Sequence, residues 1–499
     1  MYPEALRSFD AATLGVLAAT VALISIVNFM IFRRRNIDGP LFAVSPQGRS
    51  GFHSVSEVLE YTYPKFQDRV YRLRQHYGDI VVIPAKFVEA LQAAPESLLS
   101  FQFLARERFF ARYTLLVSMV DHPDNNTLIK SIKNNLNKSL GDILPTLDDE
   151  VQFAMSTHVG DANDWKAVFP AHSLLPVIAS CSGRVFVGKD LNRNPEFLDC
   201  ILNFTIDSMM GGEKLRQYPS FIRNFVQWWI PELQRSRAKL KKMMHLLGPV
   251  LEVRKGVDHV SDMLSWNVAN SPSNLKHNLK YQAHNQLIAS AAAIHTTNMQ
   301  LSHALFDLAA YPEYQAPLRE EVQTVLRTEP NGVWTKSGLA KLRKLDSFLK
   351  ESQRMNPLGL LTFERRVMND ITLPDGVTIP KGYNIGCPTS SIAKDSALWD
   401  NPNTFEAFRF ERLRQQPGCE NKHQFVTTGI DSLYFGHGKH ACPGRFLADA
   451  EIKLILINLI LHYDCKLPDG TSRPANVEMN SGVMADPTKT ILLKRRSNA

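Results

Sequence analysis

The chain has 499 residues, with 57 Lys and Arg against 49 Asp and Glu, and a formal net charge of +8. The fractions of hydrophobic residues (44%) and charged residues (21%) are typical of a globular protein with a substantial core and exclude a disordered chain. Six irregularly spaced cysteines without a Cys-x-x-Cys pair argue against a zinc site or a disulfide framework and fit a reducing compartment.

The N-terminal segment predicts a single membrane anchor. Residues 11–32 contain no charge over 22 positions, and three arginines follow directly at 33–35. A helix of this length spans about 33 Å at about 1.5 Å per residue, enough to cross a bilayer core. Because the cations follow the apolar run, we expect residues 1–10 to be lumenal and the bulk of the chain to be cytosolic. A cleaved signal peptide is the alternative.

The remainder is expected to be one mainly α domain with a small β region. Residues 33–50 read as a linker, and 51–499 as the catalytic domain. Amphipathic helical stretches such as 126–158 and 233–254 alternate with loops over residues 51–260, and a long helix is predicted from 273 to 311, stopped by Pro312. The segments 371–373, 377–379 and 383–385 resemble strands, and an apolar helix is expected over 447–461.

The long helix carries an unusual run of small residues. Residues 287–297 read Leu-Ile-Ala-Ser-Ala-Ala-Ala-Ile-His-Thr-Thr. The small side chains around Ala292 leave a hollow beside the helix. The hydroxyl of Thr296 can turn to a carbonyl one turn back and loosen the helical ladder, and His295 can pass protons near neutral pH. Packing alone is the alternative for Thr296, and a satisfied interior histidine is the alternative for His295.

Three charged residues could form ion pairs, although their spacing alone does not predict this, because chance Glu-x-x-Arg pairs are common on protein surfaces. Glu351 and Arg354 are three residues apart on one helical face. Arg409 lies in the segment Phe-Glu-Ala-Phe-Arg-Phe over residues 405–410. The planar fork of arginine suits bidentate pairing with a buried carboxylate.

A single cysteine lies in a loop suited to activating its sulfur. Residues 435–445 read Phe-Gly-His-Gly-Lys-His-Ala-Cys-Pro-Gly-Arg and precede the apolar helix. Cationic neighbours and a helix N-terminus favour the thiolate form of Cys442. Gly444 lets a flat macrocycle approach the backbone. This combination suits a thiolate ligand to haem iron, while a buried structural thiol is the alternative.

These segments resemble the cytochrome P450 family. The loop matches its haem-binding pattern Phe-x-x-Gly-x-Arg/His-x-Cys-x-Gly, with His440 where most members carry arginine. Residues 292–297 match its oxygen-binding pattern Ala/Gly-Gly-x-Asp/Glu-Thr-Thr except at Ala293 and His295. Residues 405–410 match Phe-x-Pro-x-Arg-Phe except at Ala407. The resemblance extends from about residue 50 to the end of the chain.

The resemblance implies roles for these residues. Cys442 would be the axial ligand of the haem iron, and Thr296 with His295 would deliver protons. His440 and Arg365 would contact the haem propionates. Glu351, Arg354 and Arg409 would support the haem loop. The remaining cofactor-binding residues would be Phe435, Gly436, Gly438, Gly444 and Ala292.

The function implied is a monooxygenase with haem b, which oxidises an apolar substrate with O₂ and electrons from NADPH through a reductase. We expect it at the endoplasmic reticulum membrane, with no nucleic-acid partner. The helix variant is similar to that of fungal secondary-metabolism members and favours a terpenoid, with a polyketide, sterol or prenylated indole as alternatives. A haem-thiolate isomerase or dehydratase and a non-enzymatic haem sensor are the other hypotheses. The substrate pocket is expected near 101–115, the long helix, 358–363 and 481–485.

Overall fold

The computed structural model describes residues 37, 39–45, 51–121, 126–160, 163–255 and 260–497. None of the helices in these ranges is both long and apolar enough to cross a bilayer. The predicted span 11–32 and the lumenal residues 1–10 lie outside the described residues, as does most of the predicted linker. Within that linker range, Leu41–Ala43 forms a short strand that pairs with the main sheet.

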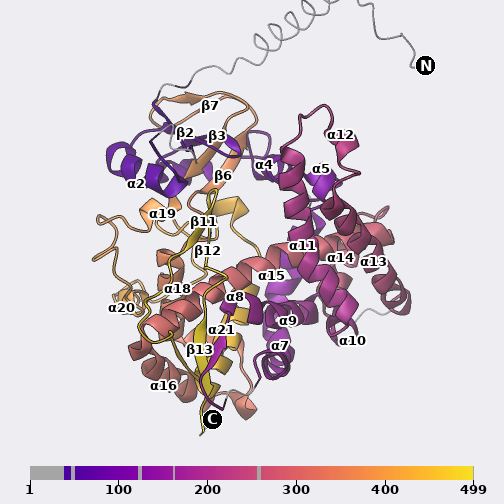
Figure 1. The fold of residues 1–499 in the computed structure, drawn as a ribbon, viewed down its shortest axis with the longest axis vertical. Helices are drawn as coiled ribbons and strands as arrows, with labels where there is room; N and C mark the ends of the chain where they lie inside the picture. Colours follow the sequence, from indigo (N-terminus) through magenta and orange to yellow (C-terminus); the bar gives the residue numbers. More distant parts are fainter. Residues whose placement is uncertain are drawn as a thin grey trace, which may run out of the picture.

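Helices make up most of the described chain (Figure 1). Those of the first half are α2 (Val55–Phe66), α3 (Val88–Leu91), α4 (Phe101–Arg108), α5 (Ala111–Thr114), α6 (Thr127–Ser131), α7 (Asn137–His158), α8 (Pro170–Ser173), α9 (Leu175–Val187), α10 (Lys189–Asn192), α11 (Pro195–Arg216), α12 (Arg223–Val226) and α13 (Pro231–Val253). Those of the second half are α14 (Met263–Asn270), α15 (Leu279–Ala310), α16 (Gln315–Leu326), α17 (Lys336–Lys341), α18 (Arg343–Met355), α19 (Thr389–Ile392), α20 (Arg409–Leu413) and α21 (Arg445–His462).

The strands form one larger sheet and three small ones. The larger sheet has the order β1 (Leu41–Ala43), β2 (Tyr71–Gln75), β3 (Gly78–Val82), β9 (Asn384–Cys387), β6 (Thr362–Val367) and β4 (Leu99–Ser100). The small sheets are β10 (Tyr463–Lys466) with β13 (Ile491–Arg495) and β5 (Lys166–Val168), β11 (Val477–Met479) with β12 (Gly482–Met484), and β7 (Ile371–Thr372) with β8 (Thr378–Ile379). The mainly α fold with a small β region is therefore confirmed.

The prediction that residues 51–260 contain only helices and loops is wrong, because β2, β3, β4 and β5 fall in that range. Strands β2 and β3 form a hairpin in which Tyr71, Leu73 and Gln75 point to the buried side while Arg72 and Arg74 alternate with them. The interleaved charges hide the alternation that identifies a half-buried strand. The strands predicted between residues 371 and 385 are present as β7, β8 and β9.

Helix α15 runs through the middle of the helical part (Figure 1). It starts at Leu279, where the side chain of Asn278 accepts the backbone N–H of Tyr281 and caps the first turn. The helix therefore begins six residues later than predicted, because the residues after Pro272 form turns. It packs against α9, α11, α13, α18 and α21, so most of its surface is buried. A helix enclosed in this way can present reactive side chains only where its neighbours leave a gap.

Candidate active site

The cysteine loop is held in a fixed shape by its own backbone. The N–H of Cys442 donates to the carbonyl of Phe435 at 2.7 Å, which closes the loop. Gly436 and Gly438 have φ angles of +68° and +70°, a region that strains residues with a Cβ. At Gly438 a Cβ would also lie 2.5 Å from the Cβ of Gln92. The sequence therefore needs glycine at both positions to place the cysteine.

Cys442 lies just before the first turn of α21. Arg445, the first residue of the helix, donates through Nη1 to the carbonyl of Cys442 at 2.7 Å. Burial raises the pKa of the Cys442 thiol, while the N–H of Gly444 and the charge of Arg445 act in the opposite direction. The sulfur residue is nevertheless only half-buried, and a Cβ added at Gly444 would meet no atom within 4 Å. Open space therefore lies beside Gly444, two residues after the cysteine.

Helix α15 has one exposed stripe. Ala292 and Thr296 are exposed although Leu287, Ala289 and Ile294 around them are buried. Residues four apart lie on the same face of a helix. The hydroxyl of Thr296 donates to the carbonyl of Ala292 at 2.7 Å, as the sequence predicts for an internal threonine. The same hydroxyl can turn from this carbonyl to a ligand in the open space.

His295 lies one position away and has different contacts. Its Nε2 lies 3.0 Å from the carbonyl of Leu202 on α11, so this nitrogen carries the proton and donates. Burial lowers the pKa of His295. The structure therefore ties a neutral His295 to the neighbouring helix, whereas Thr296 faces the open stripe.

The two predicted propionate contacts lie near each other. Arg365 on β6 is buried, its Nη1 donates to the carbonyl of Glu364 at 2.7 Å, and Nη2 has no hydrogen-bond partner among the described residues. Burial lowers the pKa of Arg365 to about 10, and the nearby Glu96 acts against this. His440 lies with its Nε2 3.1 Å from Glu96. The sequence did not indicate that Glu96 lies beside both residues.

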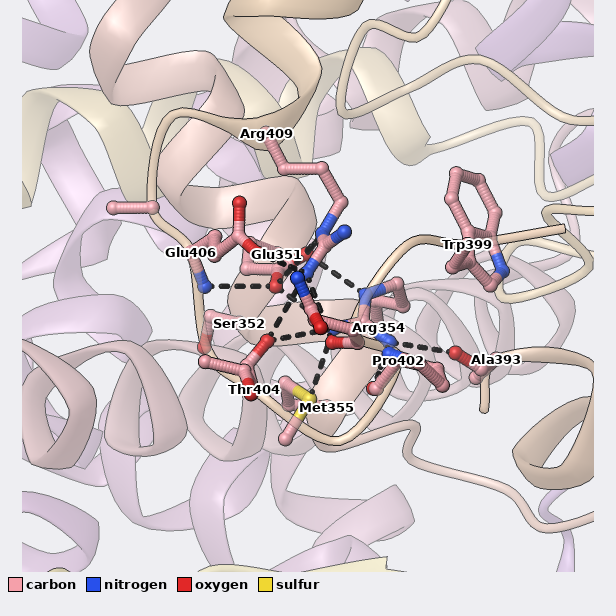
Figure 2. Close-up of polar contacts among 12 residues, drawn as sticks. Glu351, Ser352, Arg354, Met355, Ala393, Trp399, Pro402, Thr404, Glu406 and Arg409 are labelled. Atoms are coloured by element: carbon pink, nitrogen blue, oxygen red, sulfur yellow. Dashed lines mark hydrogen bonds and ion pairs between the residues drawn. The ribbon is translucent and has the colours of Figure 1, made fainter. Parts of the chain in front are cut away.

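Glu351, Arg354 and Arg409 form a buried triad (Figure 2). Arg354 donates through Nε and Nη2 to the two carboxylate oxygens of Glu351, each at 2.8 Å, and Arg409 Nε lies 3.2 Å from both. Figure 2 shows the remaining guanidinium nitrogens reaching the backbone carbonyls of the loop that contains Ala393, Pro402 and Thr404. The triad thereby clamps helix α18 to the chain that leads to α20.

Two further supports of the cysteine loop were missed. Lys350, next to the triad acid, donates through Nζ to the carbonyl of Gln424 at 2.9 Å and to Ser432 Oγ at 3.0 Å. Asn137 Nδ2 donates to the carbonyl of Pro443 at 3.1 Å. Lys350 lies on a face of α18 that the Glu-x-x-Arg pattern already marks as buried, which is the signal that could have identified it.

A cavity of about 580 Å³ borders α15 on the side of α11. Its apolar walls include Phe109, Phe110, Leu116, Leu175, Ile206, Met209, Met299, Met484 and Ala485. The predicted pocket ranges 101–115 and 481–485 contribute, as does α15 through His295. Residues 358–363 are not among its lining, and the large share from α11 was missed. Walls that are mostly apolar are typical of a site for an apolar small molecule.

The residues present fit a haem. The exposed stripe of α15 and the empty space at Gly444 provide room for a flat ring. Arg365 Nη2 and Arg445 Nε are buried without hydrogen-bond partners among the described residues, which leaves donors for acidic groups such as propionates. Cys442 supplies a sulfur ligand.

Comparisons with known proteins agree with this geometry. A family model described as Cytochrome P450 matches residues 125–494. The chain is 37% identical over 450 residues to Cytochrome P450 monooxygenase prx8 of Penicillium rubens, which covers 89% of this chain and 83% of the relative. It is 36% identical over 481 residues to Cytochrome P450 monooxygenase BOA4 of Botryotinia fuckeliana, which covers 95% and 94%. A solved structure, retinoic acid bound cyanobacterial CYP120A1, matches with a TM-score of 0.69 at 17% identity over 93% of this chain and 100% of that chain.

Proposed function

The chain is a haem-thiolate monooxygenase of the cytochrome P450 family, and we propose that it oxidises an apolar secondary metabolite in the cavity beside α15. The observation that carries the proposal is a half-buried Cys442 just before α21, a helix that packs against α15, where Ala292 and Thr296 form an exposed stripe. Haem iron bound there supplies O₂ activation with electrons from NADPH through a reductase. The protein provides ligand, proton path and pocket.

Cys442 holds the iron in this proposal. A bound metal cation keeps a coordinating thiol deprotonated, which offsets the effect of burial on its pKa. The N–H groups at the start of α21 and the guanidinium of Arg445 stabilise the sulfur charge. Gly444 and Ala292 leave space for the ring, while Phe435, Gly436 and Gly438 shape the loop that carries Cys442. Arg365 and His440 provide donors for the acidic groups of the ring.

Thr296 holds and passes the proton. Its hydroxyl donates to the carbonyl of Ala292 and can rotate to donate instead to a ligand in the space beside the stripe. Water then restores the proton of the hydroxyl. His295 has a smaller part in proton delivery. Its Nε2–H donates to the carbonyl of Leu202 on α11, so only Nδ1 can accept a proton. Thr296 is thus the direct donor, and His295 is the residue that aligns α15 with α11.

The substrate is an apolar molecule, and we retain a terpenoid as the expected class. A cavity of about 580 Å³ with aromatic, leucine and methionine walls suits a compact polycyclic or branched skeleton. Methionine side chains such as Met209, Met299 and Met484 adapt to irregular surfaces. A polyketide, a sterol or a prenylated indole would fit walls of the same character.

We also place the protein on the endoplasmic reticulum membrane through an anchor at 11–32, with residues 51–499 in the cytosol. Aromatic side chains around α12 support contact with a membrane surface: Phe221 is 77% exposed, Phe225 67%, Trp228 58% and Trp229 73%. Such exposed aromatic groups are enriched at membrane interfaces. Helix α12 lies at the outer edge of the helical part, where it is free to make that contact (Figure 1).

The test is an optical titration of the full-length, membrane-extracted protein. We expect the absorption spectrum of a thiolate-ligated haem and a shift of its Soret band on adding a terpene, with weaker shifts for polyketides, sterols and fatty acids. Cys442→Ala should abolish the thiolate spectrum. Cys419→Ala, which removes another accessible cysteine, should leave it unchanged. A spectrum that is the same in both variants would exclude Cys442 as the ligand.

A further inference from the structure

We propose that the substrate carries a carboxylate or an equivalent anionic group, which Arg216 binds at one end of the cavity. The proposal deepens the substrate assignment and rests on the proposed function. Arg216 is the last residue of α11 and lines the cavity. The cavity is also lined by His295, which precedes Thr296 on α15, so a substrate held at Arg216 lies in a cavity that borders the helix with the proton donor.

The guanidinium of Arg216 lies against two aromatic rings. Its centre lies 4.7 Å from the ring of Tyr77 and 4.3 Å from the ring of Phe110, both of which also line the cavity. Nη2 donates to the carbonyl of Arg108 at 2.9 Å. A planar cation stacked between rings loses little further freedom when it binds a carboxylate.

Arg216 also retains unused hydrogen-bond donors. Among the described residues, neither Nε nor Nη1 makes a hydrogen bond. Nε forms an ion pair with the carboxylate of Glu213 at 3.6 Å, a distance too long for a hydrogen bond. The Glu213 oxygens are occupied instead by Tyr77 Oη at 3.2 Å and His76 Nε2 at 3.1 Å. The side chain of Arg216 is 21% exposed, so it faces the cavity without being bathed in solvent. Burial lowers its pKa, which an incoming anion would reverse.

The charge at this end of the cavity favours an anion. Arg108, Arg216 and Arg223 converge here, with the last stacked 5.1 Å from the ring of Phe110. Two carboxylates face them, and that of Glu364 is paired with both Nη atoms of Arg108. Arg223 donates only to backbone carbonyls, at 2.8 and 3.2 Å. One positive charge is therefore left uncompensated beside apolar walls, where opposite charges attract more strongly than in water.

The backbone at Phe110 points to the same function. Its φ angle is +48°, a left-handed conformation that is rare for a bulky residue. Strain of this kind persists where the surrounding structure requires it, often at ligand sites. Here the conformation places the ring between the guanidiniums of Arg216 and Arg223.

The experiment compares acids with their own esters on two skeletons. Farnesoic acid and methyl farnesoate form one pair, and dodecanoic acid and methyl dodecanoate form the other. Binding to the full-length holoprotein is followed by the Soret shift, and independently by the thermal unfolding midpoint. We expect each acid to bind about tenfold to a hundredfold more tightly than its ester, as for hydrogen bonds to a charged group.

Arg216→Gln should remove this preference for acids and leave the affinities of the esters unchanged. Arg216→Lys should retain part of it, because the charge remains without the planar fork. Arg74→Gln is the control: it removes an exposed arginine paired with Asp79 that does not line the cavity. Equal affinities of acid and ester in the native protein, or a preference that survives Arg216→Gln, would overturn the proposal. Either result in a protein with an intact thiolate spectrum would leave the proposed function standing, whereas loss of that spectrum would contradict the function itself.

Discussion

The triad at Glu351 and the cavity end at Arg216 use the same side chain, arginine, in opposite ways. In the triad both guanidiniums are buried, and their donors reach the Glu351 carboxylate or backbone carbonyls. At the cavity end, Arg216 has aromatic neighbours and unused donors. A satisfied arginine fixes the position of the chain around it, and an unsatisfied one retains affinity for a ligand. The contrast separates the part of the molecule that holds shape from the part that selects substrate.

The largest expected effect comes from breaking the triad. Glu351→Ala leaves Arg354 as a buried cation without its carboxylate and Arg409 with only Glu406, which should lower the free energy of unfolding by about 3–5 kcal/mol. Urea unfolding and the haem retained per chain measure the change. The matched control is Glu252→Ala, which removes a pair of the same i, i+3 spacing with Lys255 on the surface and should have almost no effect. Equal effects of the two variants would contradict a structural role for the triad.

A second prediction concerns Glu451, a fully buried acid on α21. Burial raises the pKa of Glu451 to about 8, although Ser182 donates to it at 2.9 Å. The folded state therefore keeps this proton up to about pH 8, whereas the unfolded state releases it near pH 4.5. Between these values the folded state binds more protons, so stability falls as the pH rises.

Glu451→Gln removes this dependence. At pH 5 the variant and the native protein should have similar unfolding free energies, and at pH 7 the variant should be more stable by about 3 kcal/mol. Urea unfolding at half-unit steps from pH 5 to 8 measures the difference. Parallel curves for the two proteins would show that Glu451 is already ionised in the folded state.

The sequence predicted the residues that hold the shape of the molecule, at the triad and the cysteine loop, better than those that line the substrate cavity. Glu351, Arg354 and Arg409 were identified because they match patterns of the family at the expected positions, as were Gly436 and Gly438. The structure supplies the physical reason for these patterns: a buried ion network and two positive φ angles. Arg216 was missed, and Phe110 was covered only by the predicted pocket range 101–115. Their roles depend on bringing α5, α11 and the β2–β3 hairpin together, and no local pattern encodes that contact.

Strand prediction failed for the same physical reason that cavity prediction did. The arginines of β2 are acceptable in a strand only because the hairpin turns one face to solvent, which is a property of the assembled sheet. His295 was identified from its position in the helix pattern, but its bond to Leu202 depends on where α11 crosses α15. Contacts between segments distant in the sequence therefore determine the β2 strand and the partner of His295, and local periodicity does not predict such contacts.

Helix α15 borders the cavity, and a third prediction tests its exposed stripe. Thr296→Ala removes the hydroxyl that faces the open space and should lower product formed per NADPH consumed by about tenfold or more, within the range for loss of a proton donor. Substrate affinity should change little, because Thr296 is not part of the cavity wall. The control is Thr297→Ala, at the buried neighbour on another face of the helix. An unchanged ratio of product to NADPH in Thr296→Ala would exclude its role.

Substitutions at Gly438 and Gly444 of the cysteine loop distinguish the effect of backbone strain from the loss of space for the cofactor. Gly438→Ala meets both a φ of +70° and the Cβ of Gln92 at 2.5 Å, and should destabilise the protein by about 1–3 kcal/mol. Gly444→Ala meets neither obstacle, because no atom lies within 4 Å of its Cβ position. It should leave the unfolding free energy of the haem-free chain unchanged but lower haem retention. Full retention in Gly444→Ala would show that the ring lies elsewhere.

The smallest expected change in stability is at Phe110. A substitution there should affect acid binding but hardly stability, the reverse of the effect expected at the triad. Asparagine tolerates the left-handed conformation, so Phe110→Asn relieves strain while it loses a half-buried ring. These effects oppose each other, and the net change in unfolding free energy should stay within about 1 kcal/mol. Arg216 nevertheless loses one of its two stacking partners, so the preference for acids over esters should fall several-fold. A variant that unfolds as readily as Glu351→Ala would assign Phe110 to the shape-holding part of the molecule, and one that keeps the full acid preference would show that Arg216 is positioned by Tyr77 alone.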